Sequence, residues 1–270
     1  MKVHNKTIIV TGGGNGIGRE IVLALLSKGA KVAAVDIRED FLIETQKLAG
    51  RHASKLSLHV LNISDKAAVD LFAKEVIQIH KAVDGLINNA GIIQPFVKIA
   101  NLDLGTIEKV MNVNFYGSLH MIKAFLPHLL KRQEAHILNV SSMGGFLPVP
   151  GQSIYGASKA AIKLLSEALY AELLYTKVNV SVVFPGAIGT NISENSDVTI
   201  PSGTITDADK SKIKVLPPQE AAEAIIRGME KNKSMIYVGR DSKLMNIIYR
   251  ISPGYATRLI SKKMKSLLSD

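Results

Sequence analysis

Apolar residues occur along the chain in short, nearly unbroken runs, and the longer stretches between these runs carry apolar residues about every 3.6 positions. Unbroken runs rich in β-branched residues are typical of strands that are covered on both faces, whereas strands with one solvated face alternate apolar and polar residues. Strands are therefore predicted over residues 7–10, 31–36, 56–61, 85–88, 136–140, 178–184 and 235–238.

The stretches between the predicted strands have the periodicity of amphipathic helices. Ile21 and Leu25 share one side of the first such stretch, and Leu71, Val76 and Ile79 share one side of the third. Strands that alternate with helices at this spacing are joined in parallel by right-handed crossovers. We expect an α/β fold, a doubly wound parallel sheet of about seven strands with helices on both faces.

The C-terminal third departs from this alternation. Residues 187–215 are rich in Ser, Thr, Asp, Gly and Asn, and an irregular stretch of that length is usually a functional loop. We expect a catalytic domain over residues 1–240 with a substrate loop at 187–217, followed by a basic helical extension over residues 241–270. Helices are predicted in this extension at residues 242–251 and 255–268.

The composition narrows the class of protein. Apolar residues make up 47% of the chain and charged residues 21%, which is enough to bury a core and excludes a disordered chain. No apolar run approaches the roughly 18 residues of a membrane span, and the first residues lack a signal-peptide core, so a cytoplasmic protein is expected. The chain has no cysteine, which excludes disulfides and thiolate sites, and its seven histidines lack metal-ligand spacing, so no metal site is predicted.

The formal net charge is +10, and residues 227–270 hold ten basic against three acidic residues. The favoured interpretation is that the two last helices pack on the protein or on a sister subunit and leave a solvated basic face. The alternative is peripheral contact of residues 241–270 with an anionic membrane. Nucleic acid is not an expected partner, since no aromatic platform or reader helix accompanies the charge. The first helix is expected to contribute apolar residues to the wall of the substrate pocket or to a subunit contact, namely Leu244, Met245, Ile247, Ile248 and Ile251. In the second helix the apolar residues expected roughly on one side are Tyr255, Leu259, Met264, Leu267 and Leu268, and the basic residues toward the other side are Arg258, Lys262, Lys263 and Lys265.

A glycine-rich turn follows the first predicted strand, at residues 11–18, and a predicted helix follows the turn. Without side chains, the backbone amides of such a turn and the N-terminus of the helix can approach a pyrophosphate. The second predicted strand ends at Asp36, where a carboxylate can accept the ribose hydroxyls of an adenosine and would repel a 2′-phosphate. The pattern favours NAD as the cofactor, with NADP as the alternative because Arg38 is near.

Further motifs follow in order: Asn88-Asn89-Ala90-Gly91, Asn112-Val113-Asn114, Ser141-Ser142, Tyr155-Gly156-Ala157-Ser158-Lys159 and Pro185-Gly186. This order resembles the classical short-chain dehydrogenase/reductase family over residues 5–240 or so. The resemblance implies a Rossmann-type fold with four catalytic residues, Asn114, Ser142, Tyr155 and Lys159. It also implies a cofactor site formed by Gly12, Asn15, Gly16, Ile17, Gly18, Asp36, Asn62, Ile63, Asn88, Ala90, Gly91, Tyr155, Lys159, Pro185, Gly186, Ile188 and Thr190.

The resemblance also implies particular contacts for some of these residues. The resemblance places Asn88 and Ala90 near the adenosine ribose, Thr190 on the nicotinamide amide, and Asn114 where a water would link Lys159 to solvent. Asn62 is a departure, because the family usually has an Asp there that contacts adenine. An amide both donates and accepts hydrogen bonds, so adenine binding should survive with altered strength.

Hydride transfer to or from an alcohol carbon requires a proton to move at the alcohol oxygen. Tyr155 can move it if its pKa falls from about 10 to about 7, which takes about 4 kcal/mol. A cation about 4 Å away contributes about that much at an effective dielectric near 20. Lys159 is one helical turn further along and on the same face, so it is the expected source. Ser142 is expected to hold the substrate oxygen.

The sequence therefore predicts an NAD-dependent oxidoreductase that acts on a secondary alcohol or ketone with an apolar skeleton. One alternative is an NADP-linked carbonyl reductase, and another is a non-catalytic dinucleotide-sensing protein recruited to a membrane. Met143 and Phe146, which follow Ser142 closely, belong either to the core or to an apolar pocket wall. The resemblance also implies a homodimer or homotetramer formed through helices around residues 101–131 and 152–176.

Overall fold

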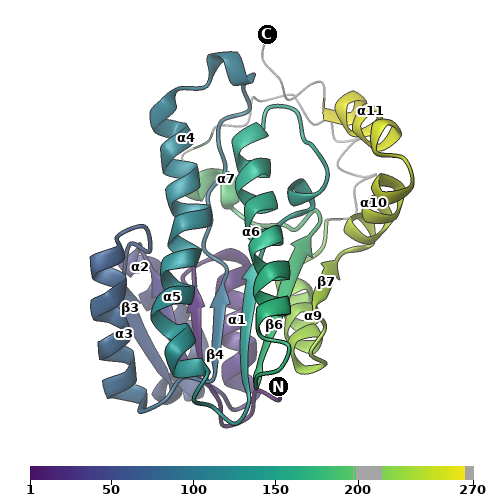
Figure 1. Ribbon diagram of the computed structural model, residues 1–270. Coiled ribbons are helices and arrows are strands. Elements are labelled where there is room, and N and C mark those ends of the chain that lie inside the picture. The colour runs from purple at the N-terminus through teal and green to yellow at the C-terminus, as the bar shows by residue number, and fades with distance from the viewer. Residues whose placement is uncertain (197, 199–214, 265–270) are drawn as a thin grey trace.

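The computed structural model describes residues 1–196, 198 and 215–264 (Figure 1). In this part of the chain seven parallel strands form one sheet in the order β3-β2-β1-β4-β5-β6-β7. The predicted Rossmann-type doubly wound sheet is confirmed, and each predicted strand lies within a residue or two of an observed one. The strands are β1 Thr7–Thr11, β2 Lys31–Asp36, β3 Leu56–Val60, β4 Gly85–Asn88, β5 Ala135–Val140, β6 Val178–Pro185 and β7 Met235–Val238.

Helices connect the strands and cover both faces of the sheet. The α-helices are α1 Gly16–Ser27, α2 Glu39–Ala49, α3 Lys66–His80, α4 Leu104–Met111, α5 Ser118–Leu129, α6 Ser153–Glu172, α7 Ile192–Asn195, α9 Pro218–Glu230, α10 Arg240–Ile251 and α11 Pro253–Met264. Shorter turns are the 3-10 helices η1 Gly50–Lys55, η2 Ile99–Asn101 and η4 Met143–Gly145 and the π-helix η3 Asn112–Gly117. Among the described residues, no helix has the length and apolar character needed to cross a bilayer.

The two layers of helices bury opposite faces of the same strands. Ile8 and Val10 of β1 pack with α1, α2 and α9, whereas Ile9 between them packs with α3, α5 and α6. Figure 1 shows α5 and α6 in front of the sheet, with α1 and α9 behind it. Every position of a central strand is therefore covered, which explains why the strand sequences are continuously apolar.

The predicted apolar side of α3 is partly wrong. Leu71 and Ile79 are 66% and 51% exposed, and the helix buries Val69, Phe72 and Val76 instead. The predicted and the observed buried sides of the helix share Val76 but are rotated relative to each other about the helix axis. Apolar periodicity alone does not decide between them, because both sides carry apolar residues.

The order of the strands creates a crevice at one end of the sheet. From β1 the chain builds outward through β2 and β3 and then returns to place β4 on the other side of β1. In such sheets the carboxyl ends of the two central strands diverge, and ligands bind between them. The glycine-rich turn after β1 and the Asn88-Asn89 segment at the end of β4 meet at this point.

The C-terminal helices α10 and α11 pack on the turn that follows β5. Ala256 and Ile260 are buried against Leu147, and Met245 and Ile248 pack beside them. Packing on the protein itself, the interpretation favoured from the sequence, is thus observed. The predicted apolar side of α11 is shifted by one residue, since Tyr255 is 54% exposed while Ala256 is buried. Lys265, Leu267, Leu268 and most of the expected substrate loop lie outside the described residues.

Candidate active site

The turn after β1 has no room for side chains. Gly12 has a φ of +66°, and a Cβ on Gly18 would lie 1.9 Å from the carbonyl oxygen of Gly12. Asn15 caps α1 by accepting a 2.7 Å hydrogen bond from the amide of Gly16. The N-terminus of α1 therefore lies at the crevice with the positive end of its dipole, which favours a pyrophosphate there.

Asp36 lies at the end of β2 beside this turn. Its carboxylate accepts hydrogen bonds from the amides of Gly14 at 3.0 Å and Arg38 at 3.1 Å. Burial raises the pKa of Asp36, and the two amide hydrogen bonds work in the opposite direction. The side chain of Arg38 is paired with Asp40 at 2.7 Å and stacks over Phe41.

Asn62 follows β3 and is exposed. Its side-chain oxygen accepts hydrogen bonds from the amide of Ser64 at 3.1 Å and from the Ser64 hydroxyl at 2.7 Å. The amide of Leu61 is bonded to the carbonyl of Asp36, which brings the two strand ends together. Asn62 therefore directly follows the residue that is bonded to Asp36, while Ile63 is buried in the core.

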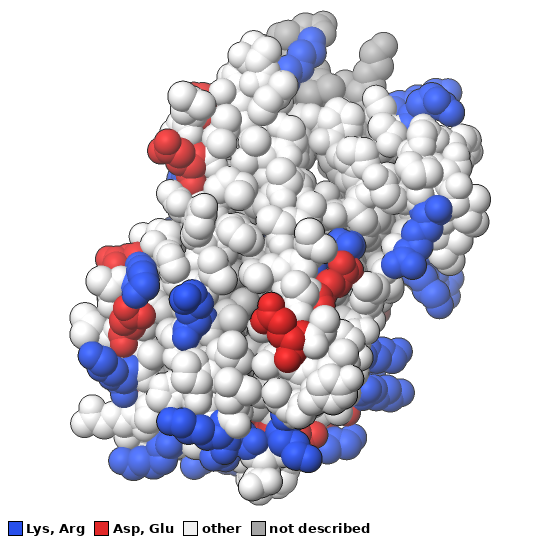
Figure 2. Space-filling view, viewed as in Figure 1, with Lys and Arg blue, Asp and Glu red and all other residues white. Residues whose placement is uncertain are grey.

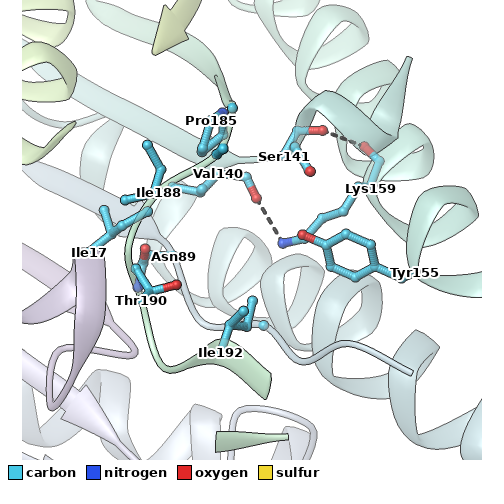
Figure 3. A pocket seen from close by; sticks show the side chains of 14 residues that line it. Ile17, Asn89, Val140, Ser141, Tyr155, Lys159, Pro185, Ile188, Thr190 and Ile192 are labelled. Atoms are coloured by element: carbon cyan, nitrogen blue, oxygen red, sulfur yellow. Dashed lines mark hydrogen bonds between the residues drawn. The ribbon is translucent and has the colours of Figure 1, made fainter. Parts of the chain in front are cut away.

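Ser142, Tyr155 and Lys159 meet in the cleft drawn in Figure 3. Ser142 follows β5, whereas Tyr155 and Lys159 lie one turn apart on α6. The hydroxyls of Ser142 and Tyr155 are hydrogen bonded. The Lys159 ammonium donates to the carbonyl of Val140 at 3.0 Å and lies 5.9 Å from the centre of the Tyr155 ring.

The electrostatics of Tyr155 differ from the sequence-based expectation. Burial raises the pKa of Tyr155, and the hydrogen bond to Ser142 opposes this rise only in part. Burial also lowers the pKa of Lys159 to about 8. The predicted fall in the Tyr155 pKa is thus not found in this structure, because the ammonium of Lys159 is bonded to Val140 and desolvation of the phenolate dominates.

Asn114 lies in the π-helix η3 and is 1% exposed. Its side chain accepts from the amide of Ile92 at 2.8 Å and donates to the Ile92 carbonyl and to Ser158 of α6, both at 2.9 Å. A single π-turn inside a helix is often found at functional sites. Asn114 therefore ties the segment after β4 to the helix that carries Tyr155 and Lys159.

Gln94 is a fully buried residue that the sequence did not single out. Its side-chain oxygen accepts from the amides of Ile154 at 2.7 Å and Tyr155 at 3.0 Å, and its nitrogen donates to the carbonyl of Gly151. Helix α6 has no side-chain cap from Gln152, the residue before it, so Gln94 takes that role from a distant loop. A lone glutamine in an irregular segment gives no sequence signal for such a contact.

The cleft has a volume of about 250 Å³. The predicted residues that line it are Ile17, Gly91, Ser142, Tyr155, Lys159, Pro185, Gly186, Ile188 and Thr190. It is also lined by residues that were not predicted, namely Asn89, Val140, Ser141, Ala187 and Ile192. The remaining predicted residues do not line this cleft; they are Gly12, Asn15, Gly16, Gly18, Asp36, Asn62, Ile63, Asn88, Ala90 and Asn114. Val140 ends β5 and Ser141 follows it, at the carboxyl edge of the sheet where ligands bind. Their position in the sequence could therefore have indicated that they line the cleft.

Asn88, which was predicted to lie near the adenosine ribose, has its side chain inside the sheet. Its side chain is 2% exposed and donates to Asn139 at 2.9 Å inside the sheet. The neighbouring Asn89 lines the cleft, and its side chain donates to the carbonyls of Thr11 and Gly12. Successive side chains of a strand point to opposite faces, so only one of the two asparagines can turn toward the glycine-rich turn.

Asp241, at the start of α10, holds the turn on the other wall of the cleft. Its carboxylate accepts a 2.7 Å hydrogen bond from the amide of Ala187, and the Ser242 hydroxyl donates to the carbonyl of Phe184 at 2.8 Å. A Cβ on Gly186 would overlap the Asp241 carboxylate. The C-terminal helices are thus fastened directly to the segment that follows β6.

Comparisons with known proteins agree with this geometry. The family model described as short chain dehydrogenase matches residues 6–200. The Mycobacterium tuberculosis protein named SadH is 33% identical over 262 residues, which cover 96% of this chain and 95% of that protein. The Bos taurus protein named dehydrogenase/reductase SDR family member 7B is 28% identical over 97% of this chain and 82% of its own length.

Two solved structures are similar over most of the chain. A Burkholderia cenocepacia short chain dehydrogenase in complex with NADP has a TM-score of 0.80 and 25% identity, covering 96% of this chain and 99% of its own. A Burkholderia phymatum short chain dehydrogenase/reductase in complex with NAD has a TM-score of 0.81 and 23% identity, covering 93% and 96%. The second likeness supports the fold alone.

Proposed function

Because the chain belongs to the short-chain dehydrogenase family, we propose that it is an NAD-dependent oxidoreductase that interconverts a secondary alcohol and a ketone on an apolar skeleton. The observation that carries the proposal is the meeting of Ser142, Tyr155 and Lys159 in one cleft, next to a turn that can hold a pyrophosphate. Tyr155 and Lys159 lie one turn apart on α6, and the fold brings Ser142, which follows β5, to them.

The glycine-rich turn fits a nicotinamide dinucleotide. A Cβ on Gly18 would overlap the backbone of the turn itself. A Cβ built on Gly16 would lie 3.5 Å from the side chain of Thr190, which belongs to the segment after β6. A pyrophosphate at the N-terminus of α1 would leave one end of the dinucleotide toward Asp36 and the other toward Tyr155. When bound there, the nicotinamide supplies the acceptor or donor of the hydride.

Asp36 and its neighbours favour NAD over NADP. The carboxylate is fixed beside the glycine-rich turn by the amides of Gly14 and Arg38, so a 2′-phosphate would meet a negative charge. The Arg38 guanidinium is engaged by Asp40 and Phe41, which draws its charge away from that position. The related solved structures contain either cofactor, so the preference rests on these residues alone.

Tyr155 is the residue proposed to give or take the proton at the substrate oxygen. Its hydroxyl is hydrogen bonded to Ser142, so a substrate oxygen that replaces this contact would lie within reach of both hydroxyls. Ser142 would hold that oxygen while charge develops on it. A positive charge on Lys159, whose ammonium lies 5.9 Å from the centre of the Tyr155 ring, would favour the phenolate form of Tyr155 if it turned from the Val140 carbonyl toward the Tyr155 hydroxyl.

The lining of the cleft supports an apolar substrate. Val140 and Ile192, which are not among the expected cofactor residues, present hydrocarbon to the same space as the hydroxyls of Ser142 and Tyr155. Sites of this kind take an apolar body and orient it through a few polar groups. Use of NAD favours the direction of alcohol oxidation.

We further propose that the enzyme is a homodimer or homotetramer assembled through α4, α5 and α6. The stripe of Ile162 and Leu169 on α6 faces the sheet and is buried, so it is not the contact surface. The outer side of the same layer exposes apolar residues instead, with Tyr116 at 46%, Leu164 at 66% and Leu174 at 52%. Figure 2 shows that the middle of this face is mostly uncharged.

The direct test of the function is Tyr155→Phe. Loss of the hydroxyl should abolish turnover with NAD and a panel of apolar secondary alcohols, while NADH binding, followed by fluorescence, stays within about twofold. Retained turnover would refute Tyr155 as the acid/base. Tight NADH binding by the wild-type protein without turnover of any alcohol or ketone would instead favour the dinucleotide-sensing alternative. A higher kcat/KM with NADPH than with NADH would favour the carbonyl reductase.

A further inference from the structure

Helix α10 turns apolar side chains outward as well as inward. Leu244, Ile247 and Ile251 are 57%, 47% and 80% exposed, and Tyr255 at the start of α11 is 54% exposed. On α10 the three exposed residues lie within about 60° of one another on the helical wheel, since successive residues are about 100° apart. The three residues form an exposed apolar strip on α10.

The strip cannot be buried by turning the helix, because the opposite side of α10 is already fixed. Ser242 is fully buried and bonded to Phe184, and Met245 and Ile248 pack with Leu147. A helix that is apolar on both sides but anchored on one leaves the other for a partner.

The charges around the strip have one sign. The exposed basic residues of α10 and α11 are Arg240, Lys243, Arg250, Arg258, Lys262 and Lys263. The only acidic residue between positions 240 and 264 is Asp241, whose carboxylate points inward to the amide of Ala187. Within the part of the chain that the structure describes, none of these six basic side chains forms a salt bridge. Figure 2 shows basic and no acidic side chains at the edge where Figure 1 draws α10 and α11.

We propose that this α10–α11 surface, formed by the apolar strip and its six basic neighbours, docks on an anionic phospholipid bilayer. Apolar side chains of a helix lying in the interface reach the acyl boundary, while flanking Arg and Lys reach the phosphates of the headgroups. Tyr255, between Arg258 and the strip, has the amphipathic character that suits this depth. The six basic residues are spread over both helices, and an anionic bilayer is negatively charged over an area wide enough to face all of them.

Docking would bring the bilayer close to the active site. The buried side of α10 packs with Phe146 and Leu147, which follow Ser142 by only a few residues, and Asp241 holds the cleft residue Ala187. An enzyme seated on these helices could receive apolar substrates directly from the lipid. The binding itself does not depend on the proposed reaction, so the two can fail separately.

The experiment is cosedimentation of the full chain with vesicles of phosphatidylcholine, with and without phosphatidylserine, at low and high salt. Binding is expected with phosphatidylserine and should weaken as salt screens the charges. The apolar variant is Ile247→Ser/Ile251→Ser, and its matched control is Leu71→Ser/Ile79→Ser, which removes equally exposed apolar residues from α3. The apolar variant should bind about tenfold more weakly, whereas the control should bind like the wild type.

The charge variant is Arg258→Glu/Lys262→Glu, with Lys47→Glu/Lys74→Glu as the control of equal charge change on exposed sites elsewhere. Each cation near an anionic surface is worth about 1 kcal/mol, so the charge variant should lose about thirtyfold or more in affinity. Thermal unfolding and NADH binding establish that every variant is folded.

Three results would overturn the proposal. One is binding by the wild type that is equal on vesicles with and without phosphatidylserine. Another is an equal loss of binding in the variants and in their controls. The third is loss of self-association, rather than of vesicle binding, in Ile247→Ser/Ile251→Ser, because this would assign the surface to a second copy of the chain. Turnover of a water-soluble alcohol by the apolar variant tests the reaction independently.

Discussion

The backbone amide of Tyr155 donates a 3.0 Å hydrogen bond to the side-chain oxygen of Gln94, a residue 61 positions earlier in the chain. The same oxygen accepts from Ile154, and the Gln94 nitrogen donates to Gly151, so a single buried side chain fixes the first turn of α6. Tyr155 is thereby held by the segment that follows β4, far from α6 in the sequence.

Gln94→Ala should leave two buried amides without a partner. The free energy of unfolding is expected to fall by about 1–2 kcal/mol, and kcat to fall about tenfold because Tyr155 is no longer held in place. Gln94→Glu keeps an oxygen acceptor at that position and should recover a larger part of kcat. Urea unfolding and steady-state kinetics on the three proteins measure both effects. Unchanged kcat in a destabilised Gln94→Ala protein would limit Gln94 to a structural role.

Asp241→Ala should disturb the cofactor side of the cleft. Removing the carboxylate leaves the amide of Ala187 unpaired, and the turn at Pro185 and Gly186 loses the group that holds it. The KM for NAD is expected to rise about tenfold, for a loss of about 1–2 kcal/mol. Asp241→Asn keeps a side-chain oxygen acceptor and should change the KM much less. If the two variants behave alike, the charge of Asp241 rather than its hydrogen bond is what matters.

Lys159→Met should abolish turnover and yet stabilise the protein near neutral pH. The folded pKa of Lys159 is about 8 against 10.5 for the free group, so burying the ammonium costs about 3 kcal/mol when both states are protonated. The variant also loses the hydrogen bond to Val140, which lowers its stability by about 1 kcal/mol. The free energy of unfolding should therefore rise by about 2 kcal/mol in Lys159→Met.

The pH dependence of the free energy of unfolding tests whether Lys159 is buried as an ammonium. Between about pH 8 and 10.5 the unfolded state binds more protons than the folded state, so the wild type gains stability as pH rises. The advantage of Lys159→Met should therefore shrink over this range in urea unfolding experiments. Lys163→Met, a partly exposed site on the same helix, is the control and should show no such convergence. An advantage that stays constant with pH would contradict burial of a charged Lys159.

Asp36→Ser should shift the cofactor preference toward NADP. The substitution removes the negative charge that a 2′-phosphate would meet, so the ratio of kcat/KM for NAD to that for NADP should fall by tenfold or more, about 1.4 kcal/mol. Asp40→Ser removes the same charge four positions further along the chain, at the start of α2, so it should shift the ratio less. An equal shift in the two variants would mean that net charge, and not the position of Asp36, sets the preference.

Prediction from the sequence succeeded where the signal is local. The strands could be found because burial on both faces demands unbroken apolar runs, and the turn after β1 because Gly12 and Gly18 have no room for side chains. Which face a helix buries was harder. Leu71 and Ile79 on α3 and Tyr255 on α11 are exposed although they lie on apolar stripes, because each helix carries more apolar residues than one contact can cover.

The sequence by itself determined the alternation of strands and helices, the glycine-rich turn and the order of the motifs, since each depends on residues close together in the chain. Only the tertiary structure decided that Asn89 rather than Asn88 faces the cleft, that Gln94 caps α6, and that Asp241 holds Ala187. These contacts join distant segments, and their geometry follows from how strands and helices stack, which no local pattern records. The same packing fixes one side of α10 against the enzyme and leaves its other apolar side exposed among basic residues.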